Sequence, residues 1–405
     1  MKKKRYLMSK YILGLCLLMI SCLYGCNATG QKPVPSGATV RTTLKTGAER
    51  TGLYLPLLKE KRVAVVANHT SLVGKTHLVD TLLAEGIAIE KIFCPEHGFR
   101  GQAEAGAAIT SGHDEKTGLE VVSLYGSNKK PTPGQMQGVD VVVFDLQDVG
   151  CRFYTYISTL HYVMEACAEN GCKLIVLDRP NPNGRRIDGP VLDSELVSFV
   201  GMRPGTPILY GMTIGEYALM IDQEHAPAKE GYELNIVKLQ GWRHGDRYVL
   251  PVAPSPNLKT EQAVGLYPSL CWFEGTNISV GRGTEYPFEV VGAPDYPYPN
   301  ITFTPVAIKG VSENPPFKNI TCYGLDLREA AIGDSINLKY LIRMYRNTPK
   351  EKFFLKNNFF DKLAGTRKLR QQLESNTSEK EIRASWQDGL EKFKAVRAKF
   401  LLYED

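Results

Sequence analysis

The chain has 405 residues, of which 43% are hydrophobic and 23% are charged, with 49 lysines and arginines against 43 aspartates and glutamates. Five of those basic residues lie within the first ten positions, so the rest of the chain carries 44 basic against 43 acidic residues and is nearly neutral. This balance argues against nucleic-acid binding, and the length suffices for one large domain and a smaller second one.

The first 26 residues have the form of an export signal. A basic stretch precedes the apolar run Tyr11 to Leu23, which is too short to remain as a membrane span. The run ends in Leu23-Tyr24-Gly25-Cys26, which has the form of a lipobox and predicts cleavage before Cys26 and acylation of its thiol. The alternatives are acylation at Cys22, an ordinary cleaved signal peptide, and an uncleaved membrane anchor. We expect an exported lipoprotein, anchored to a membrane at the periplasm or cell surface and tethered through residues 27–43.

The next part of the chain alternates between buried-strand and helix patterns. We expect strands at 62–67, 89–93, 119–124, 139–144 and 173–177, and helices at 76–85 and 154–170, the second ended by Gly171. Continuous apolar strands separated by helices predict an α/β fold with a parallel sheet covered on both faces. We place this domain at residues 44–205 and a smaller C-terminal α+β domain at 206–405.

Polar side chains follow four of the expected strands at the point where each strand ends. In chain order they are Asn68, His69, Thr70 and Ser71; Glu96, His97 and Arg100; Asp145, Gln147, Asp148 and Arg152; and Asp178, Arg179, Asn181 and Asn183. The carboxyl ends of parallel strands share one edge of a sheet, and open α/β sheets bind ligands there. A single such residue is explained equally well as a helix cap, but four strands ending this way predict a polar site.

The first candidate for an active site is the segment Phe93-Cys94-Pro95-Glu96-His97-Gly98-Phe99-Arg100-Gly101. It brings a carboxylate, an imidazole and a guanidinium to the end of an expected strand. Glycines on both sides allow backbone and ligand to approach closely.

Several other kinds of site lack their sequence motif. The chain has no G-x-G-x-x-G after the first strand, no phosphate-binding P-loop, no G-x-S-x-G and no H-E-x-x-H. The six cysteines beyond Cys26 form no C-x-x-C pair, and we expect buried thiols with at most one disulfide. His69, His97 and Asp148 could meet at a metal, but their spacing carries no metal signature. We therefore expect neither a metal nor a cofactor.

The second half of the chain has a different character. Thr213 and Glu216 form a capping box at a helix start, and residues 233–239 alternate like a strand. Residues 251–294 are rich in Pro, Gly, Asn and Ser, and their interleaved aromatic residues favour an ordered loop. We expect this loop, which includes Glu274, to be functional; the alternative is a structural connector in which Glu274 and Glu289 form surface pairs. Ser378 opens a final helix whose apolar face extends from Ile382 to Phe400.

Several segments together resemble the exo-acting β-N-acetylmuramidases, a family of glycoside hydrolases that long had no known function. Besides residues 93–101, the resemblance lies in residues 145–150, 152–156, 178–182, 211–216, 254–257, 273–277, 281–289 and 385–403. It extends in family order over roughly residues 47–403. It implies a Rossmann-like domain, a smaller C-terminal domain and an active cleft between them. It also implies release of N-acetylmuramic acid from the non-reducing ends of peptidoglycan fragments, in cell-wall turnover or salvage.

Glycosidic cleavage needs an acid for the leaving oxygen and a second carboxylate for the other face of the sugar. An acid must hold its proton, which apolar neighbours favour, and Glu96 has Phe93, Pro95 and Phe99 close in sequence. Glu96 is therefore our candidate for the general acid, with His97 orienting it or transferring a proton. The candidates for the second carboxylate, in order of preference, are Asp148, Asp145 and Glu274.

The implied muramyl substrate carries a lactyl carboxylate, which the planar fork of an arginine can pair bidentately. The candidates for this contact are Arg100, Arg152, Arg179 and Arg282. Sugar hydroxyls or the N-acetyl group could be read by Asn68, Asn181 and Asn277, and a sugar face could stack on Tyr154, Tyr156 or Trp272. A local cap, ion pair or packing role is the alternative for each of these residues.

Two rival functions stay open at this point. One is a non-catalytic lipoprotein that binds peptidoglycan through the same cleft. The other is a metal-dependent hydrolase that uses His69, His97 and Asp148. The glycosidase is favoured because the carboxylates outnumber the plausible metal ligands.

Overall fold

The computed structural model describes residues 43–96, 98–100, 112–224 and 229–405, and these belong to one compact unit. The expected leader, Cys26 and residues 27–42 of the expected tether lie outside the described residues. So does His97.

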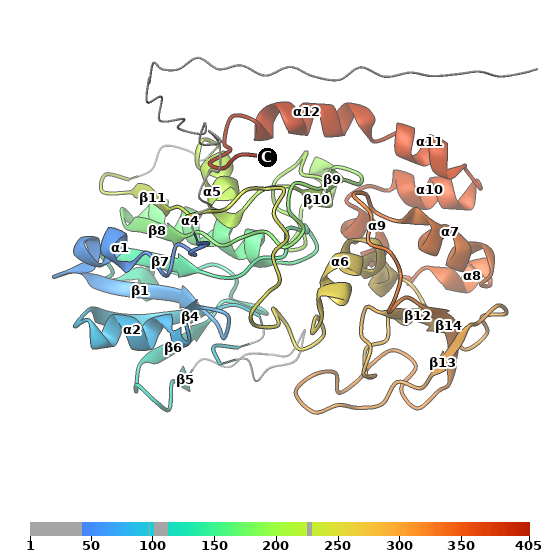
Figure 1. Cartoon of the computed structure of the whole chain (residues 1–405), viewed down its shortest axis with the longest axis horizontal. Coiled ribbons are helices and arrows are strands. Elements are labelled where there is room, and N and C mark those ends of the chain that lie inside the picture. Colours follow the sequence, from blue (N-terminus) through green and yellow to red (C-terminus); the bar gives the residue numbers. More distant parts are fainter. Residues whose placement is uncertain (1–42, 97, 101–111, 225–228) are drawn as a thin grey trace, which may run out of the picture. The chain divides into compact units, whose positions relative to one another are not determined.

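A seven-stranded sheet occupies one side of the unit (Figure 1). Six strands run parallel, and the short β5 pairs antiparallel at one edge. In chain order the strands are β1 (Arg62–Ala67), β4 (Ala88–Cys94), β5 (Gly112–His113), β6 (Glu120–Ser123), β7 (Val141–Asp145), β8 (Lys173–Leu177) and β11 (Glu233–Val237). The predicted parallel α/β sheet is confirmed.

The order of the strands in the sheet is β11-β8-β7-β1-β4-β6-β5. The chain starts in the middle at β1, moves out through β4 and β6, and then returns to the other side of β1 at β7. The direction of winding therefore reverses between β1 and β7, which is the Rossmann-type doubly wound order. The last strand, β11, lies beyond residue 205, so the sheet extends into the second half of the chain.

The sheet is buried on both faces, as the continuous apolar strands predict. Alternate residues of β1 enter two different hydrophobic cores. Ala64 and Val66 belong to the core that contains α4 (Tyr156–Asn170), whereas Val63 and Val65 belong to the core that contains the buried residues of α1 (Thr51–Leu58) and α2 (Leu78–Ala84).

The local signals for helix ends are confirmed. Gly171 ends α4 in the left-handed conformation at φ 68°. Thr213 caps α5 (Ile214–Asp222) in a capping box with Glu216, and Ser378 does the same for α11 (Glu379–Ala384) with Glu381. The prediction of a single helix in the tail was wrong, because a second helix, α12 (Gln387–Arg397), follows α11. The two helices are separated at Ser385, whose hydroxyl donates to the Ile382 carbonyl at 2.7 Å.

Residues 251–294 contain more regular structure than the expected loop. Thr260 accepts a hydrogen bond from the Ala263 amide at 3.0 Å and starts α6 (Glu261–Leu270), which continues into the 3₁₀ turn η2 (Cys271–Gly275). Strand β12 (Val290–Ala293) ends the segment. Helix α6 was not predicted because the segment is rich in Pro, Gly and Asn, which are typical of loops.

The C-terminal region combines a small sheet with helices, as the α+β prediction states. An antiparallel sheet has the order β12-β14-β13, with β13 at Ile301–Phe303 and β14 at Cys322–Asp326. The helices that follow are α7 (Leu338–Arg346), α8 (Lys350–Phe353), α9 (Phe359–Ala364), α10 (Lys368–Glu374), α11 and α12. Residues of α4, α6 and α7 share one continuous hydrophobic core, so the two regions are packed together.

Shorter elements complete the described chain. They are β2 (Leu72–Val73), β3 (Thr76–His77), α3 (Pro133–Met136), β9 (Ile187–Asp188), η1 (Ser194–Leu196) and β10 (Leu209–Tyr210). The six described cysteines are free and buried, as predicted. Within the described ranges, no helix combines the length and apolar character needed to cross a membrane.

Candidate functional site

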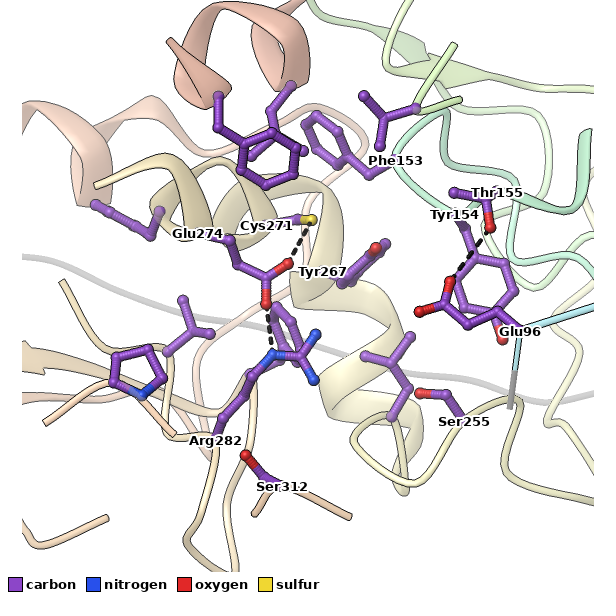
Figure 2. A pocket seen from close by; sticks show the side chains of 18 of the residues that line it. Glu96, Phe153, Tyr154, Thr155, Ser255, Tyr267, Cys271, Glu274, Arg282 and Ser312 are labelled. Carbon is purple, nitrogen blue, oxygen red and sulfur yellow. Dashed lines mark hydrogen bonds and ion pairs between the residues drawn. The ribbon is translucent and has the colours of Figure 1, made fainter. Parts of the chain in front are cut away.

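A cavity of about 960 Å³ lies between the carboxyl edge of the sheet and the C-terminal region (Figure 2). The sheet side contributes Glu96, Tyr125, Thr155 and Tyr156 to its lining. Residues from α6 onward contribute the opposite lining, which includes Tyr267, Cys271, Glu274, Asn277 and Arg282. Among the described lining residues, the carboxylates are Glu96 and Glu274 and the cations are Lys129 and Arg282.

Glu96 follows the last residues of β4 and is half-buried. The Thr155 hydroxyl donates to its carboxylate at 3.4 Å, and the Tyr156 hydroxyl donates to its backbone carbonyl at 3.4 Å. Tyr125 also bonds to the carboxylate, and its phenol pKa is raised by burial and by the charge of Glu96. Three side chains from two different segments thus hold Glu96 at the cavity wall.

Glu274 forms an ion pair with Arg282 on the other side of the cavity. Figure 2 shows Glu96 and Glu274 on opposite sides of Tyr267. The Cys271 thiol donates to the second Glu274 oxygen at 3.6 Å. Burial lowers the pKa of Arg282, but the Glu274 carboxylate outweighs it and raises that pKa overall. The ion pair therefore holds the Glu274 carboxylate in a fixed position at the cavity lining.

Aromatic side chains make the cavity wall rigid. The Tyr154 hydroxyl donates to the Pro254 carbonyl at 2.6 Å. The Tyr154 ring packs edge-to-face against Tyr156 at 4.7 Å and Tyr267 at 6.3 Å between ring centroids. Tyr267 continues the contact to Phe288 at 5.0 Å. Such rings present fixed apolar surface on which a sugar face can pack.

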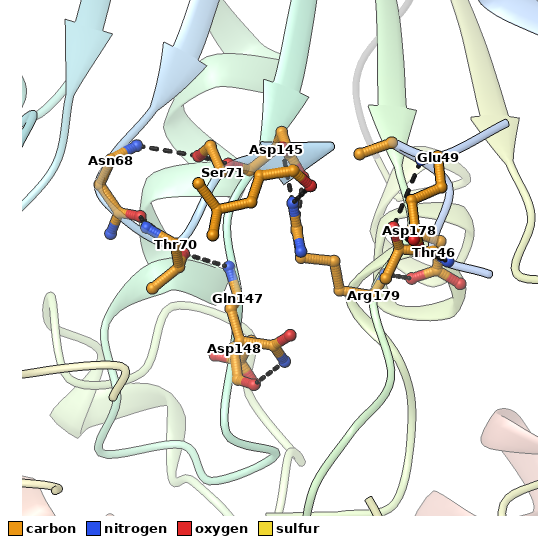
Figure 3. Close-up of polar contacts among 12 residues, drawn as sticks. Thr46, Glu49, Asn68, Thr70, Ser71, Asp145, Gln147, Asp148, Asp178 and Arg179 are labelled. Atoms are coloured by element: carbon orange, nitrogen blue, oxygen red, sulfur yellow. Dashed lines mark hydrogen bonds and ion pairs between the residues drawn. The ribbon is translucent and has the colours of Figure 1, made fainter. Parts of the chain in front are cut away.

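A second polar network fills the point where the sheet reverses direction, between β1 and β7 (Figure 3). Arg179 donates to both Asp145 oxygens at 2.6 and 2.9 Å, and both side chains are buried. The Ser71 hydroxyl donates to the Asp145 carbonyl, and the Thr70 hydroxyl accepts the Gln147 amide at 3.3 Å. The switch point, which binds cofactors in other doubly wound sheets, is occupied here by the protein's own side chains.

Asn68 connects this network to the cavity. Its amide nitrogen donates to the Tyr156 hydroxyl at 2.6 Å, and Tyr156 in turn contacts Glu96. Its amide oxygen accepts from the Thr70 amide at 2.9 Å. Asn68 is completely buried, so the structure places it behind the cavity wall.

Asp148 is buried away from the described cavity lining. One of its oxygens accepts from the Tyr210 hydroxyl and from the Gly150 amide, the latter at 2.6 Å. Its other oxygen has no hydrogen-bond partner among the described residues. Burial raises the pKa of Asp148 to about 7, despite the opposing effect of those two hydrogen bonds.

Two further candidates, Arg100 and Arg152, make structural contacts and are not among the described residues of the cavity lining. Arg100 pairs bidentately with Asp114 at 2.7 Å for each contact. Arg152 is completely buried, and it donates to the carbonyls of Val200, Leu363 and Ala364 at 3.2, 3.0 and 3.0 Å. Burial lowers the pKa of Arg152 to about 10.

Asn181 and Asn277 take backbone contacts. The side-chain nitrogen of Asn181 donates to the Met212 backbone carbonyl at 3.0 Å. The side-chain oxygen of Asn181 accepts from the Asn183 backbone N–H at 2.8 Å. Asn277 lines the cavity and donates to the Lys352 carbonyl at 2.5 Å.

The structure thus brings six of the predicted site residues to one cavity, namely Glu96, Tyr154, Tyr156, Glu274, Asn277 and Arg282. The described lining does not include Asn68, Arg100, Asp145, Asp148, Arg152, Arg179 or Asn181. Among the described residues, no group of three or more His, Cys, Asp or Glu side chains could hold a metal ion. His69, a candidate for the metal alternative, contacts the Ala253 carbonyl at 2.9 Å through Nε2.

Sequence reasoning missed Tyr125 and Lys129. Both lie in the loop that follows β6, at the same edge of the sheet as Glu96. The rule that polar side chains gather after parallel strands also applies to this strand, so the signal was present in the sequence. Tyr267 and Cys271 gave no such signal, because they lie on α6 and η2 in an apolar context.

Comparison with known proteins gives consistent similarities. Residues 63–262 match the family described as exo-beta-N-acetylmuramidase NamZ, N-terminal, and residues 265–403 match its C-terminal counterpart. The chain is 40% identical over 374 residues to the peptidoglycan beta-N-acetylmuramidase NamZ of Bacillus subtilis (strain 168), covering 86% of this chain and 89% of that protein.

Two crystal structures of DUF1343 family proteins from Bacteroides fragilis NCTC 9343 have a similar fold. The first has a TM-score of 0.81 and 42% identity, and the match covers 90% of this chain and all of that one. The second has a TM-score of 0.77 and 29% identity, with 89% and 99% covered.

Proposed function

The chain belongs to the NamZ family of exo-β-N-acetylmuramidases and is a glycoside hydrolase, and from this premise we propose that it releases N-acetylmuramic acid from the non-reducing ends of peptidoglycan fragments, with Glu96 as general acid. The observation that carries the proposal is the cavity in which two carboxylates, Glu96 and Glu274, face a common space from opposite walls. Glycosidases cleave their substrate between two such groups.

The surroundings of Glu96 fix the orientation of its side chain. It is half-buried, and it accepts from Thr155 and bonds to Tyr125, so its carboxyl group is oriented before substrate arrives. In the proposed reaction Glu96 gives its proton to the glycosidic oxygen as the bond to the sugar breaks. The leaving alcohol then departs neutral.

Glu274 is our proposal for the second carboxylate. The ion pair with Arg282 holds it in place, and a carboxylate is what the other face of the sugar needs as the anomeric carbon becomes positive. Asp148 and Asp145 ranked higher in the sequence, but the first is buried beside Tyr210 and the second is paired with Arg179. Neither is among the described residues that line the cavity.

Sugar release by the purified protein tests the proposal. The substrate is a disaccharide whose non-reducing end is N-acetylmuramic acid, and free N-acetylmuramic acid is followed by mass spectrometry with and without a chelator. We expect release by the parent that is indifferent to the chelator and is lost in Glu96→Gln. Binding without release from this or longer fragments would favour a non-catalytic peptidoglycan-binding lipoprotein. Activity abolished by chelator and restored by metal would favour the metal-dependent alternative.

We also propose that the protein is exported and anchored to a membrane through acylated Cys26. The basic start, the short apolar run and the Cys at the end of the lipobox support this proposal. Labelling of cells with a fatty-acid analogue, followed by capture of the protein, tests it. The label should appear on the parent and be absent from Cys26→Ser, and equal labelling of the two would contradict it.

A further inference from the structure

We propose that Lys129 binds the lactyl carboxylate of the muramyl substrate and so determines the preference for muramic acid, an inference that rests on the proposed function. In this assignment Lys129 takes the place of the four arginines that the sequence suggested for the lactyl contact.

The four arginines are already paired or bonded in the structure. Asp114, Asp145 and Glu274 neutralise Arg100, Arg179 and Arg282. Arg152 is fully buried and donates to three backbone carbonyls. Of these arginines only Arg282 lines the cavity, and a substrate carboxylate there would compete with Glu274.

Lys129 is the remaining cation among the described residues of the cavity lining. Its ammonium lies 4.9 Å from the centroid of the Phe199 ring, and within the described ranges no carboxylate forms an ion pair with it. The side chain is half-buried. A partly desolvated ammonium held over an aromatic face gains more from an anionic ligand than a fully hydrated one does.

The charges of the cavity match one ligand carboxylate. Glu274 and Arg282 compensate each other as an ion pair. The proposed reaction requires Glu96 to carry a proton before the glycosidic bond breaks, so Glu96 is counted as neutral. Lys129 then leaves one unbalanced positive charge among the described lining residues. A muramyl unit with a free lactyl group brings one negative charge, whereas N-acetylglucosamine brings none.

A chain of side-chain contacts connects Lys129 to Glu96. Tyr125 bonds to Glu96, its ring lies 6.4 Å from Phe199, and Phe199 lies under the Lys129 ammonium. These contacts place Lys129 and Glu96 on one wall of the cavity. The lactyl ether is on the sugar ring whose anomeric bond is broken, so both contacts must lie within about one sugar's width.

The backbone on both sides of Lys129 is fixed. The side-chain amide nitrogen of Asn128 donates to the Ser123 backbone carbonyl at 2.8 Å. Lys130 pairs with Glu165 and Glu169 of α4 at 3.1 and 2.7 Å. The ammonium is therefore presented by an anchored loop, which limits the entropy lost when it binds.

Hydrolysis rates of two aryl β-glycosides test the inference, one of N-acetylmuramic acid with its free lactyl carboxylate and one with the neutral lactyl carboxamide. We expect the parent to prefer the acid in kcat/KM by about tenfold or more, the usual effect of a charge-assisted hydrogen bond. Lys129→Met should abolish that preference by lowering kcat/KM for the acid to the level measured for the carboxamide. Lys129→Arg, which keeps the charge, should restore most of it, and the exposed-surface control Lys59→Met should behave as the parent.

The outcomes separate this inference from the proposed function. A parent that hydrolyses both glycosides equally, or a Lys129→Met protein that keeps the preference for the acid, overturns the role of Lys129 and leaves the muramidase intact. If Arg282→Lys removes the preference instead, Arg282 is the recognition residue and the inference is wrong. A parent that hydrolyses neither glycoside and releases no sugar from the natural disaccharide overturns the proposed function itself.

Discussion

Tyr156 joins Asn68 to Glu96: its hydroxyl accepts the Asn68 amide at 2.6 Å and contacts the Glu96 backbone carbonyl at 3.4 Å. The buried polar network at the sheet switch point therefore ends one hydrogen bond away from the proposed acid. Tyr156 is fully buried, and its ring packs against Tyr154, so the link is held in place. Through Tyr156, the buried network fixes the position of the cavity wall that carries Glu96.

Tyr156→Phe should lower kcat of sugar release by several-fold while the protein stays folded. The change removes the hydroxyl that holds Glu96 and leaves the buried Asn68 amide without that acceptor, which costs about 1–3 kcal/mol. Steady-state kinetics and thermal melting measure the two effects. Unchanged kcat would show that the link does not position Glu96.

Asp145→Ala should destabilise the protein by about 3–5 kcal/mol, because it leaves the Arg179 guanidinium buried without its partner. The free energy of unfolding in urea measures the loss. The control is Asp145→Leu combined with Arg179→Met, which removes both charges and should lose less. A single variant as stable as the double variant would contradict a structural role for this pair.

The pH dependence of stability should include a contribution from Asp148. Its pKa is near 3.8 in the unfolded chain and about 7 in the folded protein, so the folded state binds more protons between these values. Stability from this group is therefore full below about pH 4 and is lost as the pH rises toward 7, by about 1.4 kcal/mol per unit.

Asp148→Asn should remove that slope. Urea unfolding from pH 4.5 to 7.5 tests this, and the difference between variant and parent is the useful quantity. The histidines His69 and His77, whose pKa values burial lowers, contribute equally to both proteins and cancel. A difference that is constant across the range would show that Asp148 is ionised throughout.

Gly275→Ala should disturb the wall that holds Glu274. A Cβ at Gly275 would lie 2.4 Å from the backbone nitrogen and Cα of Phe360, and backbone atoms cannot move aside cheaply. We expect a loss of about 1–3 kcal/mol and reduced activity. Gly52→Ala is the control, since nothing lies within 4 Å of its added Cβ in α1 and the change should raise stability slightly. Equal stability of the two variants would contradict the packing at Gly275.

The strands that are buried on both faces could be predicted from the sequence, because a continuous run of apolar residues is visible within each strand itself. The sequence also predicted the caps at Thr213 and Ser378, since a capping box is complete within four residues. It could not rank the polar residues at the strand ends. In the sequence, Asp145 and Asp148 are placed after a strand just as Glu96 is. In the structure Asp145 is buried against Arg179, which is 34 residues away, and Asp148 is buried against Tyr210, which is 62 residues away.

The second wall of the cavity was less accessible to sequence reasoning. Glu274 was named from an expected loop, yet it lies on the 3₁₀ turn after α6. The pairing of Glu274 with Arg282 depends on how residues 275–282 return past this turn, which composition does not encode. Lys129 was missed because a lysine in a loop is usually a solvated charge, and its distinction here is the Phe199 ring beneath it.

The role of Glu96 as general acid is tested most directly by comparing two leaving groups in Glu96→Gln. One substrate is the natural disaccharide, whose leaving alcohol needs a proton, and the other is a dinitrophenyl β-glycoside of N-acetylmuramic acid, whose phenolate leaves without one. We predict that the variant loses at least about a hundredfold in kcat/KM on the disaccharide and little on the dinitrophenyl glycoside. A loss of equal size on both substrates, or full activity on the disaccharide, would contradict the assignment of Glu96.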